Sequence, residues 1–103
     1  MKNILLICGS GASSGFMAAA IRKAAKKSGI EMKVKAASES QLDDLIKDTD
    51  ILLIGPHLSY MLAELEQKTL GKAIKVAVIP QSIYGALNGP KAVEMIQKME
   101  GED

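Results

Sequence analysis

The chain has one cysteine, one histidine and no long apolar run. A single cysteine cannot form an internal disulfide, the device that stabilises many small secreted domains. No apolar stretch approaches the roughly 20 residues that a membrane-spanning helix needs. The opening MKNILLIC is interrupted by glycine too early to form the apolar core of a signal peptide. These absences predict a cytoplasmic protein without a membrane span of its own.

The chain also lacks an excess of charge of either sign, with 13 basic residues, 12 acidic residues and a formal net charge of +1. Non-specific binding to DNA or RNA needs a broad cationic surface. The composition therefore argues against a nucleic-acid partner. A length of 103 residues with 48% hydrophobic content fits a single domain spanning residues 1–103.

Four short apolar segments alternate with segments of helical periodicity. The apolar segments predict strands at residues 3–8, 32–37, 50–55 and 74–79. After each strand, apolar residues recur at intervals of three and four, as on one face of a helix. The predicted helical stripes are Met17, Ile21 and Ala24; Leu42, Leu45 and Ile46; Leu58, Met61, Leu62 and Leu65; and Ala92, Met95, Ile96 and Met99.

Local signals mark where two of these helices begin. Ser38 with Gln41 three residues later has the pattern of a capping box for the second helix. Gly89 followed by Pro90 predicts the start of the last helix, because proline is tolerated at the first helical position. We interpret Tyr60 as a residue that packs the third helix against the core.

The composition of the strands predicts their order. Residues 4–7 and 51–54 are continuous aliphatic runs, as expected for central parallel strands covered on both faces. The second strand alternates apolar residues with Lys33 and Lys35, which suits an edge strand. These features favour an α/β fold with an open four-stranded parallel sheet of order 2-1-3-4 and helices on both faces. Ligands of such sheets bind at the carboxyl ends of the strands, beside the switch between strands 1 and 3.

The segment CGSGASSG follows the first strand and therefore lies at that switch. Its three glycines allow backbone conformations that a β-carbon forbids, so that successive amide N–H groups can converge on an oxyanion. Its serines lie where a helix should begin, and the helix amino terminus adds a positive potential that favours a thiolate at Cys8. We predict Cys8 as the nucleophile. The predicted phosphate-binding residues are Gly9, Ser10, Gly11, Ala12, Ser13, Ser14 and Gly15.

The same segment lacks three features of other phosphate loops. No lysine follows the last glycine, as a Walker loop requires, and the glycine spacing differs from that of a dinucleotide fingerprint. The position six residues after Cys8, where cysteine phosphatases carry an arginine, is Ser14. Arg22, the only arginine, is interpreted as a solvated or partner-binding residue. Without a guanidinium to stabilise the transition state of hydrolysis, a phosphocysteine should persist until an acceptor arrives.

Two more segments follow strands at the same predicted edge: GPHLSY after the third strand and PQSIYG after the fourth. His57 is a candidate to hydrogen-bond the phosphoryl group or a partner's histidine, and we favour a surface or capping role for it. Tyr84 is a candidate to contact partners, and equally a residue that packs its loop onto the core. The sequence implies no metal and no organic cofactor.

Three motifs carry a family resemblance: the cysteine with its following GSGASS, DILLIGPHLSYML at residues 50–62, and VIPQSIYGALNG at residues 78–89. With them the chain resembles enzyme IIB of the lactose, cellobiose and chitobiose family of the phosphoenolpyruvate-dependent sugar phosphotransferase system. The resemblance implies the fold of low-molecular-weight tyrosine phosphatases and a phosphotransferase activity. It implies that Cys8 accepts phosphate from a phosphohistidine of enzyme IIA and passes it to a sugar bound by the membrane enzyme IIC.

The resemblance also assigns roles within the loop. Gly11 corresponds to the family's loop glycine, and Ser13 and Ser14 correspond to the hydroxyl residues that close the phosphate loop. The sequence departs from the commoner pattern in having Ala12 where methionine is frequent and Gly15 where a larger residue is usual.

The residues leave the substrate and two other activities open. The family resemblance implies a β-linked disaccharide such as cellobiose, chitobiose or lactose, without choosing among them. A cysteine phosphatase-like hydrolase and a non-catalytic anion-sensing module are the alternatives.

Overall fold

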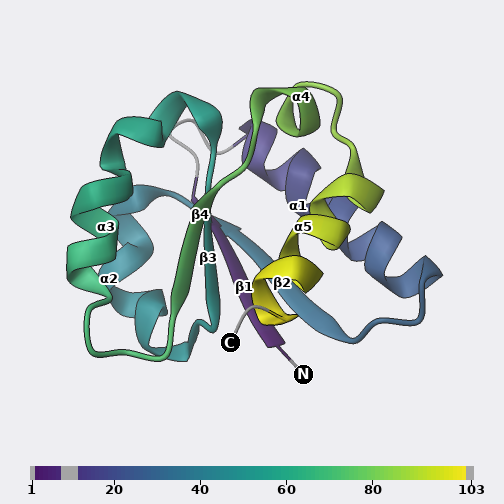
Figure 1. Ribbon diagram of the computed structural model, residues 1–103. Helices are drawn as coiled ribbons and strands as arrows, with labels where there is room; N and C mark the ends of the chain where they lie inside the picture. Colours follow the sequence, from purple (N-terminus) through teal and green to yellow (C-terminus); the bar gives the residue numbers. More distant parts are fainter. Residues whose placement is uncertain (1, 8–11, 102–103) are drawn as a thin grey trace.

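Four parallel strands form one sheet in the order β2-β1-β3-β4 (Figure 1). The strands are β1 (Lys2–Ile7), β2 (Met32–Ala37), β3 (Ile51–Ile54) and β4 (Lys75–Val78). The structure is a computed structural model that describes residues 2–7 and 12–101. The strand order and the parallel pairing confirm the fold class that the sequence predicts.

Helices cover both faces of this sheet (Figure 1). One face carries α1 (Ala12–Lys27) and α5 (Gly89–Gly101). The other face carries the short 3-10 helices η1 (Glu39–Gln41), η2 (Ile46–Asp48) and η3 (Pro56–Met61) together with α2 (Leu42–Leu45) and α3 (Leu62–Lys68). A further short helix, α4 (Gln81–Tyr84), lies in a segment predicted as a loop, and its first turn forms because the Pro80 carbonyl accepts from the N–H groups of Ile83 and Tyr84.

The two central strands contribute side chains to both hydrophobic layers. In β1, Ile4 and Leu6 pack on the side of α1 and α5, whereas Leu5 and Ile7 pack on the side of α2 and α3. Strand β3 alternates in the same way, and all four of its residues are buried. Burial on both faces explains the continuous aliphatic runs and confirms that these strands are central.

Strand β2 is an edge strand, as its lysines predict. Lys33 and Lys35 are exposed while Val34 between them is buried. The Arg22 Nη1 atom donates a hydrogen bond of 2.7 Å to the Val34 carbonyl oxygen. The Arg22 side chain therefore satisfies one main-chain acceptor of the edge strand β2. The sequence interpretation of Arg22 does not include this hydrogen bond.

Helix α5 approaches α1 closely at its first residue. A β-carbon built on Gly89 would lie 2.3 Å from the carbonyl oxygen of Ala20. The preceding residue, Asn88, caps the helix, since its Oδ1 accepts a hydrogen bond of 3.2 Å from the Lys91 N–H group. The start predicted at Gly89 and Pro90 is confirmed, with an asparagine cap in addition.

The capping box predicted at Ser38 is half formed. The Gln41 side chain accepts from the Ser38 N–H group at 3.2 Å, as a capping box requires. The Ser38 hydroxyl instead lies 2.9 Å from the hydroxyl of Ser40. The segment begins as a 3-10 turn, in which the Gln41 N–H group bonds to the Ser38 carbonyl, rather than as a regular α-helix.

The prediction that Tyr60 packs against the core is wrong, because its side chain is 76% exposed. The buried residues of this segment are Leu58, Met61 and Leu65, spaced by three and four. Leu58 has a non-helical backbone, and the following turn is 3-10. Tyr60 lies between two buried positions of this stripe and so projects into solvent.

Candidate functional site

Three strands end together at one edge of the sheet. In the register of the sheet, Ile7 of β1 pairs with Ile54 of β3, which pairs with Val78 of β4. The Gly55 N–H group donates to the Ile7 carbonyl at 3.0 Å, and the Ile79 N–H group donates to the Ile54 carbonyl at 2.8 Å. The segment after β3 therefore starts beside the last residue of β1, and Cys8 is the next residue in the chain.

Half of the predicted segment of residues 8–15 falls outside the part of the chain that the structure describes. Cys8, Gly9, Ser10 and Gly11 lie outside the described residues. The chain is described again from Ala12, where α1 begins. Ser13 and Ser14 belong to the first turn of this helix, as predicted, but their side chains and that of Ala12 are not among those described.

Helix α1 supplies a favourable potential at its amino terminus. The helix has 16 residues, with no acidic residue in its first turn and with Lys26 and Lys27 in its last turn. Unpaired N–H groups make the start of a helix positive, and an acidic residue there would offset that potential. An anion held near the start of α1 meets no such carboxylate within the first turn of the helix.

The expectation that Gly15 adopts a backbone conformation reserved for glycine is wrong. Gly15 lies inside α1, and among the described glycines only Gly29 and Gly71 have a positive φ. A β-carbon at Gly15 would meet no atom within 4 Å. The helix has already started three residues earlier, so its regular backbone determines the conformation here.

The structure brings His57 and Tyr84 together at this edge. Their ring centroids are 5.8 Å apart and the ring planes are inclined by 70°, an edge-to-face arrangement. Tyr84 is buried in the core between the sheet and α1, which confirms the packing role as one of its two predicted roles. His57 is exposed. The tyrosine therefore anchors α4 on the core and supports the histidine of η3.

The apolar periodicity of the sequence does not predict two exposed apolar residues in the segments that follow β1 and β4. Phe16, the only phenylalanine of the chain, precedes the buried stripe of α1 by one position and is 67% exposed. Leu87 is 41% exposed in the turn between α4 and α5. The sequence feature that could have indicated an exposed Phe16 is its position, one residue before the apolar stripe of α1 begins.

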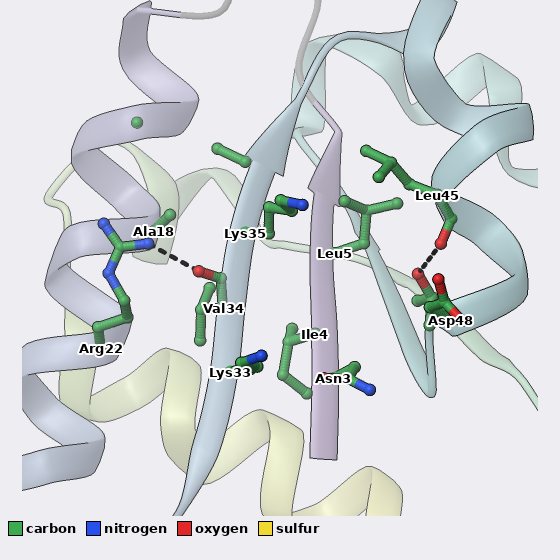
Figure 2. A pocket seen from close by; sticks show the side chains of 13 residues that line it. Asn3, Ile4, Leu5, Ala18, Arg22, Lys33, Val34, Lys35, Leu45 and Asp48 are labelled. Carbon is green, nitrogen blue, oxygen red and sulfur yellow. Dashed lines mark hydrogen bonds between the residues drawn. The ribbon is translucent and has the colours of Figure 1, made fainter. Parts of the chain in front are cut away.

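A cavity lies along the open edge of β2, and its described lining includes no residue of β3 or β4. It measures about 790 Å³ and includes side chains from both faces of the sheet, such as Arg22 and Asp48 (Figure 2). Lys33 and Lys35 of β2 also line it. Gly15 is the only predicted phosphate-binding residue among its described lining. The cavity is a groove at the open edge of the sheet.

Within residues 2–7 and 12–101, no group of three or more His, Cys, Asp or Glu side chains is placed to hold a metal ion. The described helices are also too short or too polar to cross a membrane.

A comparison with protein families decides the relationship. Residues 3–95 match the family described as "PTS system, Lactose/Cellobiose specific IIB subunit". The chain belongs to this family. The IIB relatives include the oligo-beta-mannoside-specific EIIB component of Bacillus subtilis, 33% identical over 94 residues and covering 91% of each chain. A lactose-specific EIICB component of Lacticaseibacillus casei is 28% identical over 92% of this chain but only 17% of that longer protein.

Solved IIB structures share the fold. The lactose-specific IIB domain of Streptococcus pneumoniae superposes with a TM-score of 0.86 over 94% of this chain and 95% of that chain, at 16% identity. The cellobiose-specific IIB protein of Borrelia burgdorferi superposes with a TM-score of 0.73, over 91% of this chain and 86% of that chain, at 32% identity. The architecture of this IIB chain is therefore that of its family, which has the low-molecular-weight phosphatase-like fold.

Proposed function

We propose that this IIB chain is a phosphocarrier in sugar uptake. In this proposal Cys8 accepts a phosphoryl group from a phosphohistidine of enzyme IIA and transfers it to a sugar bound by the membrane enzyme IIC. The chain is then a phosphotransferase whose covalent intermediate is a phosphocysteine. The phosphoryl group would be bound by the segment of residues 9–15.

One observation carries this proposal: the chain's only cysteine directly follows Ile7, the last residue of β1, which lies at the edge where three strands end, and α1 begins four residues after the cysteine in the sequence. In open α/β sheets ligands bind at this edge. The positive end of a helix stabilises both a thiolate and a phosphoryl group. Nucleophile and anion-binding potential thus come from neighbouring parts of one chain.

The reaction consists of two displacements at phosphorus. In the first, the Cys8 thiolate attacks phosphohistidine, an S–P bond forms, the N–P bond breaks, and the imidazole leaves with its electron pair. In the second, a sugar hydroxyl attacks, an O–P bond forms, the S–P bond breaks, and the thiolate is regenerated while the hydroxyl proton passes to a base. Positioning and main-chain N–H groups do most of the catalytic work in such transfers.

The location of Arg22 favours transfer over hydrolysis. A cysteine phosphatase uses an arginine to stabilise the charge on the transferring phosphoryl group. The only arginine of this chain instead donates to the Val34 carbonyl of β2. The phosphocysteine should therefore resist water and wait for an acceptor, which makes the hydrolase alternative the less favoured one.

The relatives indicate the kind of sugar and partner. Their printed specificities include oligo-beta-mannosides, cellobiose and lactose, which are β-linked sugars. Some relatives join the C and B components in one EIICB chain. We propose a β-linked disaccharide as the substrate and a membrane enzyme IIC as the acceptor-bearing partner, with the chain acting in the cytoplasm at the inner face of the membrane.

The test uses intact-mass spectrometry and the fact that the chain has one cysteine and one histidine. The chain is incubated with phosphoenolpyruvate, the general phosphocarrier proteins and a cognate enzyme IIA. We expect one phosphoryl group on the native chain and on His57→Ala, and none on Cys8→Ser. Membranes containing enzyme IIC and a β-linked disaccharide should then remove it with formation of sugar phosphate.

Three results would contradict the proposal. One is the absence of any adduct despite an active enzyme IIA, which would support the anion-sensing alternative. Another is retention of the adduct in Cys8→Ser with loss in His57→Ala, which would place the phosphoryl group on the histidine. The third is release of free phosphate in the absence of sugar and enzyme IIC, which would support a hydrolase.

A further inference from the structure

The charges of the chain are unevenly distributed along the sequence. Segments 3–21, 51–63 and 76–90 contain no Asp, Glu, Lys or Arg. Residues 22–35 carry six of the 13 basic residues and one of the 12 acidic residues, a formal charge of +5. The other 7 basic and 11 acidic residues of the chain give −4. The nearly neutral composition therefore conceals one strongly basic segment, which spans the end of α1 and the start of β2.

The six basic residues of this segment are all exposed, and we call the surface that they form the basic patch. On α1, Arg22 donates its hydrogen bond to the Val34 carbonyl of β2, and Lys26 lies one helical turn further along on the same side. The other members of α1 lie on its outer surface beside these two. The basic patch consists of Arg22, Lys23, Lys26, Lys27, Lys33 and Lys35.

The basic patch continues around the open edge of the sheet. Lys33 and Lys35 alternate with Val34, whose side chain packs on the side of α1, so both lysines belong to the other face of the sheet. Figure 2 shows these lysines and Arg22 along the groove of about 790 Å³ at this edge. Asp48 is the only carboxylate among its described lining residues. Three cations therefore share this groove with one carboxylate.

No cation of the basic patch forms an ion pair with a carboxylate in residues 2–7 and 12–101. By contrast, Lys68 and Lys91 lie close to Asp43 and Glu94. Two local preferences contribute to the patch, because cations are favourable in the last turn of a helix and on an edge strand. The fold brings these two sets of cations onto one surface, and the described carboxylates leave their charge unpaired.

The basic patch is separated from the edge where Cys8 follows β1. In the register of the sheet, Lys33 and Lys35 pair with residues 3 and 5 of β1, whereas Cys8 comes after residue 7. On α1, which starts at residue 12, the patch occupies the last six residues, 22–27. A partner bound to the basic patch therefore leaves the carboxyl edge of the sheet open.

We infer that the basic patch binds the anionic surface of a lipid bilayer and holds the chain against the membrane by the open edge of β2. The inference rests on the proposed function, in which a membrane enzyme binds the acceptor sugar. Clusters of roughly four to eight basic residues are attracted to anionic lipid headgroups. Lysine suits such a surface, because its ammonium is a point charge on a flexible stem and needs no fixed geometry.

The residue types of the basic patch favour a bilayer over a nucleic acid, which is the other common polyanion. Five of the six cations are lysines, and the one guanidinium, that of Arg22, is held by the Val34 carbonyl. Residues 22–35 contain no aromatic side chain on which a base would stack. The patch thus supplies charge without the groups that read or stack bases.

Vesicle flotation of the full chain tests the inference. The vesicles contain phosphatidylcholine, with and without roughly one third phosphatidylglycerol. We expect the native chain to bind the anionic vesicles at about 50 mM NaCl and to be released at about 500 mM NaCl, because salt screens exposed charges. Binding to the neutral vesicles should be at least about tenfold weaker.

Two double variants with the same change in net charge separate the basic patch from the charge of the whole chain. Lys26→Gln/Lys33→Gln should bind anionic vesicles about tenfold or more weakly, because each basic residue near the surface contributes about fivefold. Lys72→Gln/Lys98→Gln removes exposed lysines outside the patch and should bind within about twofold of the native chain. All four lysines are exposed, so both variants should melt close to the native temperature.

Four results would overturn the inference. The native chain fails to bind anionic vesicles, it binds neutral vesicles equally well, or both double variants weaken binding equally. The fourth is tighter binding to a short DNA duplex than to vesicles, lost in Lys26→Gln/Lys33→Gln, which would assign the basic patch to a nucleic acid.

Failure of the inference and failure of the proposed function are distinguishable. Phosphorylation of Cys8 by enzyme IIA is measured without vesicles, so a chain that accepts the phosphoryl group but binds no anionic vesicle refutes only the membrane contact. A native chain that binds anionic vesicles but receives no phosphoryl group from an active enzyme IIA refutes the proposed function.

Discussion

The contact between Gly89 and Ala20 makes Gly89→Ala the sharpest test of the packing of α5 on α1. The added β-carbon would lie 2.3 Å from the Ala20 carbonyl oxygen and 2.8 Å from its carbonyl carbon, where ordinary contact begins at 3.4 Å. The obstructing atoms are backbone atoms of a helix, which cannot move aside by rotating a side chain. Relief requires the two helices to separate by about 1 Å, which loosens the contacts on either side.

Overpacking of this kind costs about 1–3 kcal/mol and occasionally more. Because the obstruction at Gly89 is backbone, we place the cost at the upper end, about 3 kcal/mol. The gain in helix propensity from alanine is at most about 1 kcal/mol and applies weakly at the first helical residue. For a domain of this size each kcal/mol shifts the melting temperature by roughly 4–8 °C. Gly89→Ala should therefore melt more than about 8 °C below the native chain.

The matched control is the same substitution at Gly15. That glycine lies inside α1, is exposed, and has no atom within 4 Å of its β-carbon position. Gly15→Ala should stabilise the domain by about 0.5–1 kcal/mol. Thermal and urea unfolding of both variants measure the two effects. Equal melting temperatures for Gly89→Ala and the native chain would refute the close packing of α5 on α1.

Three further predictions concern other contacts. Leu87→Gly should raise the free energy of unfolding by about 1 kcal/mol, because the φ of +49° strains leucine; a lower urea midpoint would contradict this. Arg22→Met keeps the aliphatic stem but removes the hydrogen bond to Val34, and should lower the free energy of unfolding by about 1 kcal/mol; an unchanged urea midpoint would show that this bond contributes nothing. The Lys68 Nζ atom lies 2.8 Å from Asp43 Oδ1. The hydrogen bond to Asp43 raises the pKa of Lys68 above its ordinary value of 10.5. The stabilising effect of this ion pair is therefore present below pH 10.5 and is lost as the pH rises through the folded-state pKa of the lysine. An NMR titration of Lys68 should show this higher midpoint, which returns toward 10.5 in Asp43→Asn.

Family membership and fold were accessible from the sequence because they depend on long, regular patterns. The aliphatic runs at 4–7 and 51–54 predicted strands that are covered on both faces of the sheet. The alternation of apolar residues with Lys33 and Lys35 predicted a strand at the edge of the sheet. The stripes of α1 and α5 also lie where their spacing predicted. Such patterns average over many residues, so a single exception does not alter them.

Individual side chains near the site were less predictable. Tyr60 was assigned to the core and is exposed, because a 3-10 turn and a kink at Leu58 change the angular position of each residue. Gly15 was assigned to a loop and is helical. Both depend on local backbone geometry. The spacing of residues along the chain does not show where a regular helix starts or where a turn departs from it. The interpretation of Arg22 as solvated agrees with its exposure, and the sequence did not predict its hydrogen bond to Val34.

The sequence by itself determined the strand order, the two apolar layers, the position of Cys8 after the first strand and the absence of charge from segments 3–21, 51–63 and 76–90. These properties follow from residue type and periodicity along the chain. Only the tertiary structure decided that the His57 ring lies against the Tyr84 ring and that Gly89 lies close to the Ala20 carbonyl. Those facts arise where segments distant in sequence are brought together by burying both faces of one sheet, and the geometry of that burial is a property of the folded chain.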